Sequence, residues 1–464
     1  MTGIMYQLDF NHPVWVHFIG IGGISMSGLA EVLLGRGFRV SGSDGKESEL
    51  TRKLAADGAE IFYGQRAGNI SDGIDVVVYT AAIHPDNPEF QAAVEKSIPI
   101  LTRAELLGQM MRNYRTAVAV AGTHGKTTTT SMITEILLEG NCDPTISVGG
   151  MLDCIGGNIR VGKSDSFVTE ACEYTNSFLS FYPTVGVILN IREDHLDFFK
   201  DLADIRHSFR LFAERIPEEG LLIISSNIEN YEEITAGLPC RVQMVGMRAE
   251  DDYRMDHITY NASGKPEFDC YVKGSDAPEH MVLNVPGEHN AWNALAAIAV
   301  GREMNVSMDI IAEGLRHFTG THRRFEYKGK LGGITIVDDY AHHPDEIRAT
   351  LAAARRCDSK RIVCVFQPHT YTRTKALMDE FVDALSLADR VVLAKIYAAR
   401  ETDTLGVSSG DLCKKLKAKG VDAWYFSTFD EIETFLLENS IDGDLLITMG
   451  AGDVVNIGEK LLGR

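Results

Sequence analysis

The segment Ala117-Val-Ala-Val-Ala-Gly-Thr-His-Gly-Lys-Thr-Thr128 decides the fold of the central part of the chain. Its apolar start predicts a short buried strand, and the apolar spacing from Met132 to Leu137 predicts a helix that ends before Gly140. A strand, a glycine-rich turn and a helix form a phosphate cradle, because amides of the turn and of the helix N-terminus can point at phosphate oxygens. Val120 stands where the usual P-loop has its first glycine, so this loop is a shortened form.

This loop provides the first group of candidate site residues. Lys126 is placed to reach the terminal phosphates of a nucleotide, and the hydroxyl of Thr127 is a suitable ligand for Mg²⁺. The residues expected to bind the nucleotide here are Gly122, Thr123, His124, Gly125, Lys126, Thr127 and Thr128.

The size and composition of the chain limit its function. Its 464 residues suggest about three domains. The formal net charge of −20 argues against general nucleic-acid binding, which needs a basic surface. The sequence has no apolar run long enough for a transmembrane helix and no secretory signal, and its eight cysteines show no CxxC spacing. We therefore expect a cytoplasmic protein with reduced thiols that binds neither nucleic acid nor membrane.

The N-terminal part alternates short apolar strands with helical stretches. Strands expected at 14–19, 39–44 and 75–79, with a helix over 26–34, predict a parallel sheet with a nucleotide site at the strand ends. The turn Gly20–Ser25 is similar to a dinucleotide fingerprint but has Ser25 in place of the third glycine. NAD, another nucleotide or a simple tight turn are all compatible with it. The candidate binding residues here are Gly20, Gly22, Gly23, Ser25, Met26, Ser27, Asp44 and His84.

Acidic and histidine side chains follow further predicted strands of the central part. Glu173 comes after the strand expected at 166–170 and is a candidate Mg²⁺ ligand, although Glu170 competes for this role. The strand expected at 185–190 runs into a polar cluster that ends at Asp197, where His195 is a candidate for binding a metal or a phosphate. Ligand sites of open α/β sheets lie at the carboxyl ends of strands, which favours a functional role for this cluster.

A helix expected over 291–300 carries two asparagines near its start. Asn290 and Asn293 are three residues apart and share a helix face, and their amides suit the edge of an adenine base. An N-cap role for Asn290 is an open alternative.

The C-terminal part reads as another small α/β domain, with strands expected at 334–339, 361–366, 390–396 and 445–448. Polar groups again follow the strands. Beside the pair Arg323-Arg324, the first strand ends in Asp338, Asp339, Tyr340, His342 and His343, and the second is followed by His369, Arg373 and Lys375. Arginine stabilises charge on a transferring phosphoryl group, and the second group suits an anionic substrate.

The motifs GTHGKTTT, NIREDHLD, GEHNAWN, GTHRRFE and DDYAHHP, in this order, resemble the Mur ligases, the ATP-dependent amide-forming enzymes of peptidoglycan synthesis. The similarity covers almost the whole chain. The segments GIGGISMSGLAEVL and FQPHTYTRT are similar to the members that join L-alanine to UDP-N-acetylmuramate. The chain departs from those members at Ala341, where Gly is frequent, and at Thr370 and Lys375, where Arg is common.

The resemblance implies an α/β fold of three domains. Residues 1–113 would form a Rossmann-like domain that binds the UDP-sugar, residues 114–325 a P-loop domain that binds ATP and Mg²⁺, and residues 326–464 a Rossmann-like domain that binds the amino acid. The lactyl carboxylate of UDP-N-acetylmuramate would attack the γ-phosphate of ATP, and L-alanine would then attack the resulting acyl phosphate.

The same resemblance implies roles for individual residues. Lys126 would hold the β- and γ-phosphates, Thr127 and Glu173 one Mg²⁺, and His195 a second Mg²⁺. The residues expected to act directly in the reaction are Lys126, Glu173, His195, Arg324 and His343. Further contacts to ATP are implied for Asn290, Asn293, Arg324, Asp339 and Tyr340, with Arg323 as the alternative to Arg324, and contacts to the substrates for His342, His343 and Arg373.

The sequence is also compatible with other functions. A related recycling ligase would add a peptide to the same sugar nucleotide, and a tripeptide in place of L-alanine distinguishes it. An oxidoreductase would use Gly20 and Asp44 for NAD but leaves the P-loop unexplained. A non-enzymatic regulator would bind ATP and the UDP-sugar without turnover. The sequence leaves open the oligomeric state, the base that deprotonates the amine, and the selectivity among L-alanine, glycine and L-serine.

Overall fold

The computed structural model of the chain describes residues 6–80, 82–195, 198–399 and 401–464. By their internal contacts these residues form two compact units. The first unit extends to Ile191 and includes Ala203–Val245 and Ala299–Val306, and the second consists of Arg192–Leu202, Gly246–Ile298 and Ser307–Arg464. None of the described helices is long and apolar enough to cross a membrane.

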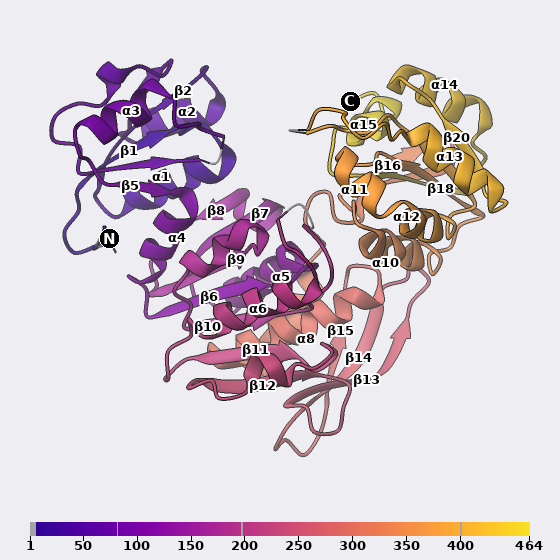
Figure 1. The fold of residues 1–464 in the computed structure, drawn as a ribbon. Coiled ribbons are helices and arrows are strands. Elements are labelled where there is room, and N and C mark those ends of the chain that lie inside the picture. Colours follow the sequence, from indigo (N-terminus) through magenta and orange to yellow (C-terminus); the bar gives the residue numbers. More distant parts are fainter. Residues whose placement is uncertain (1–5, 81, 196–197, 400) are drawn as a thin grey trace. The chain divides into compact units, whose positions relative to one another are not determined.

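The N-terminal sheet of the first unit, in which β1, β2 and β5 can be seen in Figure 1, is parallel, as the sequence predicts. Its strand order is β3-β2-β1-β4-β5. The order reverses between β1 and β4, so the turn that follows β1 lies at the switch point where ligands of such sheets bind. The strands are β1 (Trp15–Ile19), β2 (Arg39–Asp44), β3 (Glu60–Tyr63), β4 (Val76–Tyr79) and β5 (Ile100–Thr102), and the helices are α1 (Ile24–Gly35), α2 (Glu49–Ala56), α3 (Pro88–Glu95) and α4 (Arg103–Met111).

Helix α4 ends earlier than the sequence suggests. The helical pattern extends to Arg115, whereas the observed helix stops at Met111. Asn113 accepts a hydrogen bond from the amide of Phe10 and donates to the carbonyl of Leu8, each over more than a hundred residues of sequence. These long-range contacts turn the chain towards the next strand, and a local pattern carries no information about them.

A second sheet of the first unit has the strand order β12-β11-β10-β6-β9-β7-β8, in which only β8 is antiparallel to its neighbour. Helix α5 (Lys126–Glu139) packs against β6, β7 and β9 and ends with Gly140 as its C-cap, as predicted. Strand β6 lies inside the sheet and buries the apolar run Ala117–Ala121 completely. The strands are β6 (Thr116–Ala121), β7 (Thr145–Leu152), β8 (Gly157–Arg160), β9 (Ser166–Ala171), β10 (Val185–Ile188), β11 (Leu221–Ser225) and β12 (Arg241–Gly246), and the remaining α-helices are α6 (Leu202–Ala213) and α7 (Glu232–Thr235).

The second unit contains a C-terminal sheet with the order β16-β17-β21-β18-β19-β20, in which only β16 runs antiparallel to its neighbour. Alternate residues of β18 face two separate cores, one shared with α10, α12 and α13 and the other with α14 and α15. The strands are β16 (Glu326–Leu331), β17 (Ile334–Asp339), β18 (Arg361–Phe366), β19 (Arg390–Leu393), β20 (Asp422–Tyr425) and β21 (Asp444–Met449). The helices are α10 (Pro344–Ala354), α11 (Tyr371–Ala376), α12 (Met378–Leu385), α13 (Ser409–Ala418), α14 (Phe429–Asn439) and α15 (Val455–Leu461).

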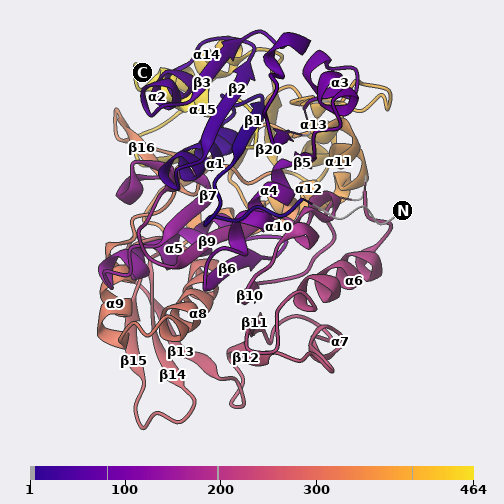
Figure 2. The same ribbon diagram turned by 90° about the vertical axis from the view of Figure 1, so that its left-hand side faces the viewer.

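The second unit also holds an antiparallel group of strands, β13 (Tyr253–Tyr260), β14 (Pro266–Val272) and β15 (Glu279–Val282). Helix α9 (Met308–His317) packs against β15 (Figure 2). Helix α8 (Glu288–Glu303) begins three residues before the predicted start at Ala291. The strand expected at 390–396 ends at Leu393, and the other predicted strands agree with the structure to within two residues.

Candidate functional site

The turn after β1 is held by hydrogen bonds to the backbone and to one side chain of β2. Gly20 has a φ of +85°, and its amide donates to the carbonyl of Ser43 at 2.9 Å. The carboxylate of Asp44 accepts from the amide of Gly22 at 2.9 Å, so this acid supports the turn. A side chain on Gly22 would clash with Asp44, because its Cβ would lie 2.8 Å from Oδ2. The turn leads into α1, which has no acidic residue in its first turn.

The other N-terminal candidates lie near this turn or just past a strand. Ser25 lies in the first turn of α1, and Met26 and Ser27 are buried within the helix. The hydroxyl of Ser27 donates to the carbonyl of Ile24. His84 is exposed after β4.

The loop after β6 has the geometry of a phosphate cradle. Gly122 and Gly125 both have positive φ, and Gly125 is the N-cap of α5. Asn190 fixes the loop from the end of β10, because its Oδ1 accepts from the amide of His124 at 2.9 Å and its Nδ2 donates to the carbonyl of the same residue at 3.0 Å. Helix α5 has no acid in its first turn, so its N-terminal amides face no competing side-chain charge of their own helix.

Lys126 and Glu173 form a buried ion pair beside this loop. Nζ of Lys126 lies 2.8 Å from Oε2 of Glu173, and the two side chains are 16% and 3% exposed. Burial alone would lower the pKa of Lys126, but the Glu173 carboxylate, together with Cys172 and Glu170, raises the pKa above its usual value. The ammonium also donates to the carbonyls of Gly122 and Thr123. The lysine is therefore charged and folded back over the loop.

The structure separates the roles of the two competing glutamates. The hydroxyl of Thr127 donates to Oε2 of Glu170 at 3.0 Å, and Oε1 of Glu170 accepts from the amide of Gly149. Glu170 therefore joins β9 to α5 and β7, whereas Glu173 is the partner of Lys126. The sequence offered both acids as candidates, and their spacing alone could not assign these partners.

In the second unit, the loop residues Asp194 and His195 lie beside the side chains that follow β18. The guanidinium of Arg373 donates to Oδ1 of Asp194 at 3.3 Å and contacts Nδ1 of His369 at 3.3 Å. Burial would raise the pKa of Asp194, but His195 and Arg373, together with His342 and His343, hold the pKa well below its usual range. Asp194 is thus an ionised anchor for Arg373, a role that the sequence did not assign to it. The end of the motif, Leu196 and Asp197, lies outside the described residues.

His195 and His369 are held in defined orientations. His195 has a φ of +53°, and its amide donates to Oδ1 of Asp194. The ring of His369 stacks on Tyr397, with 5.6 Å between the centroids, and burial, with His342 and Arg373 nearby, lowers its pKa to about 4. His369 is therefore neutral at pH 7, and the positive charge of this group comes from Arg373.

The end of β17 distinguishes Arg323 from Arg324. The guanidinium of Arg323 donates to Oδ2 of Asp338 at 3.1 Å and to the carbonyl of Gly450 at 2.8 Å, so it ties this turn to the sheet. Both guanidinium groups lie over the ring of Tyr340, that of Arg323 at 4.8 Å and that of Arg324 at 5.2 Å from its centroid, so the bonds to Asp338 and Gly450 are what distinguish Arg323. Burial raises the pKa of Asp339 to about 6 despite the opposing charge of Arg324. Asp339 therefore remains mainly ionised at neutral pH, and its oxygens accept from the amides of Phe325 and Ala341.

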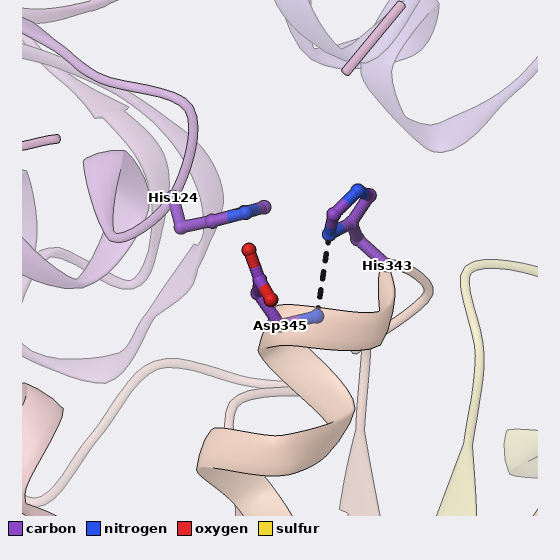
Figure 3. A group of neighbouring side chains, drawn as sticks. All are labelled: His124, His343 and Asp345. Carbon is purple, nitrogen blue, oxygen red and sulfur yellow. Dashed lines mark hydrogen bonds between the residues drawn. The ribbon is translucent and has the colours of Figure 1, made fainter. Parts of the chain in front are cut away.

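His343 caps a helix in this structure. Its Nδ1 accepts from the amide of Asp345 at 3.3 Å (Figure 3), and Glu346 completes a capping box at the start of α10. His342 lies beside it and contacts Glu346 and the ring of His369. The predicted contact of both histidines with substrate remains a prediction, but part of the role of His343 is to begin α10.

The asparagines of α8 are both buried and lie on one helix face. Nδ2 of Asn293 donates to Oδ1 of Asn290 at 3.2 Å, and Nδ2 of Asn290 donates to the carbonyl of Pro286. Because α8 begins at Glu288, Asn290 lies inside the helix, and the N-cap alternative is wrong. Contact with adenine remains a prediction for this pair.

Sequence models of the Mur ligase family match almost the whole chain. The model described as Mur ligase family, catalytic domain, matches residues 15–115, that of the Mur ligase middle domain residues 120–301, and that of the Mur ligase, glutamate ligase domain, residues 323–452. The UDP-N-acetylmuramate–L-alanine ligase of Lachnospira eligens is 59% identical over 459 residues, which are 99% of this chain and 100% of the relative. The chain belongs to the Mur ligase family. The α/β fold with three domains that the motifs imply is thereby confirmed, while the boundaries at 113/114 and 325/326 remain predictions.

Further relatives agree with this membership of the Mur ligase family. The UDP-N-acetylmuramate–L-alanine ligase of Agathobacter rectalis is 58% identical over 99% of this chain and 100% of its own length. Among solved structures, UDP-N-acetylmuramate-alanine ligase MurC from Thermotoga maritima superposes with a TM-score of 0.78 at 30% identity, covering 97% of this chain and 99% of that one. A murein peptide ligase from Psychrobacter arcticus shares the fold, with a TM-score of 0.69 at 24% identity over 97% of this chain and 98% of that one.

Proposed function

We propose that this Mur ligase joins L-alanine to the lactyl carboxylate of UDP-N-acetylmuramate at the expense of ATP. The observation that carries the proposal is the 59% identity over 99% of the chain with a ligase of that name. Such a reaction belongs to peptidoglycan synthesis, and through it to cell-wall biogenesis, cell shape and cell division. The chain is expected to act in the cytoplasm, as its composition predicts.

The proposed reaction proceeds in two transfers. An oxygen of the lactyl carboxylate attacks the γ-phosphorus of ATP, and ADP leaves with the electron pair of the broken P–O bond. The nitrogen of L-alanine then attacks the acyl carbon of the acyl phosphate, and inorganic phosphate leaves as the amine loses a proton. Because both substrates of the first transfer are anions, positive groups around the phosphates should provide most of the stabilisation.

The loop after β6 fits the phosphates of ATP. Two glycines of positive φ, an N-terminal helix end without acids and the charged Lys126 together favour an anion. Lys126 would move from Glu173 to the β- and γ-phosphates. Asn290, Arg324 and Asp339 are proposed to contact the rest of the nucleotide, with Arg324 preferred because Arg323 is bound to Asp338 and Gly450.

A hydroxyl and nearby carboxylates also fit Mg²⁺, which prefers hard oxygen ligands. Thr127 and Glu173 are proposed to hold one ion and His195 a second, where the positive charge of the metal would offset the charge of the phosphates. When Lys126 turns to the phosphates, Glu173 remains as a buried carboxylate whose cation has moved away. A metal ion would replace that cation, whereas Glu170 keeps its two neutral donors.

We expect Glu173→Gln to raise the Mg²⁺ concentration needed for half-maximal rate by about tenfold to a hundredfold, as typical of a metal site that loses one supporting group. The amide keeps the shape of the side chain but loses the charge that Mg²⁺ requires. Glu170→Gln is the matched control, and it should shift the Mg²⁺ titration less. A larger shift in the Glu170 variant would assign the metal to Glu170 instead.

Phosphate release tests the proposed function directly. The full chain should release phosphate from ATP with UDP-N-acetylmuramate plus L-alanine, and the product should carry an alanyl amide by mass spectrometry. Faster turnover with the tripeptide L-alanyl-γ-D-glutamyl-meso-diaminopimelate than with L-alanine would favour the recycling ligase. Binding of both nucleotides without any turnover would favour a regulator.

A further inference from the structure

The carboxylate of Glu401 binds the start of a helix that is distant from it in the sequence. Its Oε2 accepts from the amides of Tyr371 at 2.6 Å and Thr372 at 3.0 Å, and its Oε1 accepts from the hydroxyl of Thr372. These amides belong to the first turn of α11, where N–H groups have no acceptor within the helix. Glu401 therefore caps a helix to which it does not belong.

Helix α11 has few means of holding its own start. It has six residues, fewer than the roughly 12–15 that a helix needs to be stable without tertiary contacts. Its N-cap, Thr370, makes no side-chain capping bond and has a φ of +67°, which is unfavourable for a residue other than glycine. Its first turn contains no acid of its own. The orientation of α11 thus depends on contacts from outside the helix, and Glu401 supplies such contacts at its start.

Arg373 is the residue that α11 contributes to the candidate site. Its side chain is only 14% exposed, and its two terminal nitrogens lie 3.3 Å from Oδ1 of Asp194 and 3.3 Å from Nδ1 of His369. Because the guanidinium is held at its end, a shift of the α11 backbone would disturb both contacts. Glu401 binds the two residues directly before Arg373, so it fixes the backbone from which this side chain extends.

The segment that carries Glu401 also holds the histidine beside Arg373. The ring of His369 stacks on that of Tyr397, whose carbonyl accepts from the amide of Thr370 at 2.9 Å. The amide of Glu401 donates to the carbonyl of Ala398 at 2.9 Å, so the carboxylate extends from a turn that directly follows this anchored tyrosine. One segment therefore orients both His369, through Tyr397, and the helix of Arg373, through Glu401.

We propose that Glu401 is a positioning residue, which caps α11 and thereby holds Arg373 ready for the carboxylate of the incoming amino acid. This inference rests on the proposed function, because it takes L-alanine as the substrate that Arg373 contacts. A guanidinium that is already held on a fixed backbone loses little freedom when it binds a carboxylate. Without the cap the start of α11 is free to move, and the substrate must order Arg373 on binding, which lowers its affinity.

Steady-state kinetics of phosphate release by the full chain test this proposal. In Glu401→Ala the KM for L-alanine should rise by about tenfold, while the KM values for ATP and UDP-N-acetylmuramate stay unchanged. Glu401→Gln keeps an oxygen that can accept from both amides, and should recover most of the loss. Glu431 is the matched control, because it caps α14 through the amide and hydroxyl of Thr428, and α14 carries no candidate site residue. Glu431→Ala should leave every KM unchanged.

Combination with Arg373→Ala distinguishes positioning from a general loss of stability. Because Glu401 acts through Arg373, Glu401→Ala should raise the KM for L-alanine little further in a chain that already lacks the Arg373 side chain. Additive effects of the two substitutions on this KM would overturn the proposal. A fall in kcat with an unchanged KM for L-alanine would also overturn it, and so would an equal rise of this KM in Glu431→Ala.

Hydrogen exchange measured by mass spectrometry gives a readout that needs no turnover. Peptides that contain the amides of Tyr371 and Thr372 should exchange faster in Glu401→Ala than in the wild type, and at the wild-type rate in Glu431→Ala. Unchanged exchange in Glu401→Ala would overturn the proposal, because α11 would then be held without this carboxylate. Should the wild-type chain fail to release phosphate with L-alanine, the proposed function would be refuted, whereas hydrogen exchange would still decide whether Glu401 holds α11.

Discussion

Lys126→Ala is expected to lower the rate of phosphate release by about 10²–10³-fold, the usual cost of removing one group that stabilises developing charge. Lys126 is the charged side chain folded over the loop after β6, and it lies within reach of any phosphate seated on the N-terminus of α5. Its charge would neutralise the β- and γ-phosphates as the carboxylate oxygen attacks. Alanine leaves the loop backbone intact, so the loss should appear mainly in kcat.

The variant should still fold, because Asn190 and the two glycines hold the loop without help from Lys126. Circular dichroism and the melting temperature would check this, with some loss of stability expected since Glu173 loses a cationic partner. Lys53→Ala removes an exposed lysine that pairs with Glu31, and should have wild-type kinetics. A kcat of Lys126→Ala close to that of the wild type would refute the role given to this lysine.

The sequence predicted strands well where apolar runs end at turn residues. The strands at 334–339 and 361–366 have the predicted bounds, because each contains an apolar run that is largely buried in the sheet. The sequence did not predict the end of a helix where contacts with distant residues determine it. The end of α4 depends on Asn113 contacting Leu8 and Phe10, and nothing near Asn113 in the sequence announces that contact.

The candidate site shows the same division. Placing polar residues at strand ends was enough to select Glu173 and the groups after β17 as candidates, and Glu173 does lie beside Lys126 of the glycine-rich loop, because parallel strands bring their carboxyl ends to one edge of a sheet. The position of a strand end could not distinguish two adjacent residues of the same type. Arg323 and Arg324 differ because Arg323 has a φ of +63° and its side chain bonds to Asp338 and Gly450, which only the folded backbone determines.

Gly108→Ala is expected to cause the largest loss of stability, at or beyond the upper end of the roughly 1–3 kcal/mol typical of overpacked sites. A Cβ at this position of α4 would lie 1.9 Å from the carbonyl oxygen of Ser180. The atoms that this Cβ would meet belong to the backbone of Ser180 and Phe181, so no side-chain rotation relieves the overlap and α4 must move away. The displaced partner is the 3₁₀ segment Tyr174–Ser180, which directly follows Glu173. The melting temperature and kcat should therefore fall together.

Alanine substitutions at two other glycines serve as controls, because they distinguish the clash with the Ser180 backbone from the general effect of adding a methyl group. Gly68→Ala meets no atom within 4 Å and has an ordinary φ, so its melting temperature should equal that of the wild type. Gly28→Ala meets mainly the side chain of Ile159, which can turn aside in part, so its loss should be intermediate. An unchanged melting temperature in Gly108→Ala would show that α4 does not rest on the backbone of Ser180. A loss no larger than that of Gly28→Ala would show that this backbone yields as readily as a side chain, and Glu173 would then owe its position to Lys126 rather than to α4.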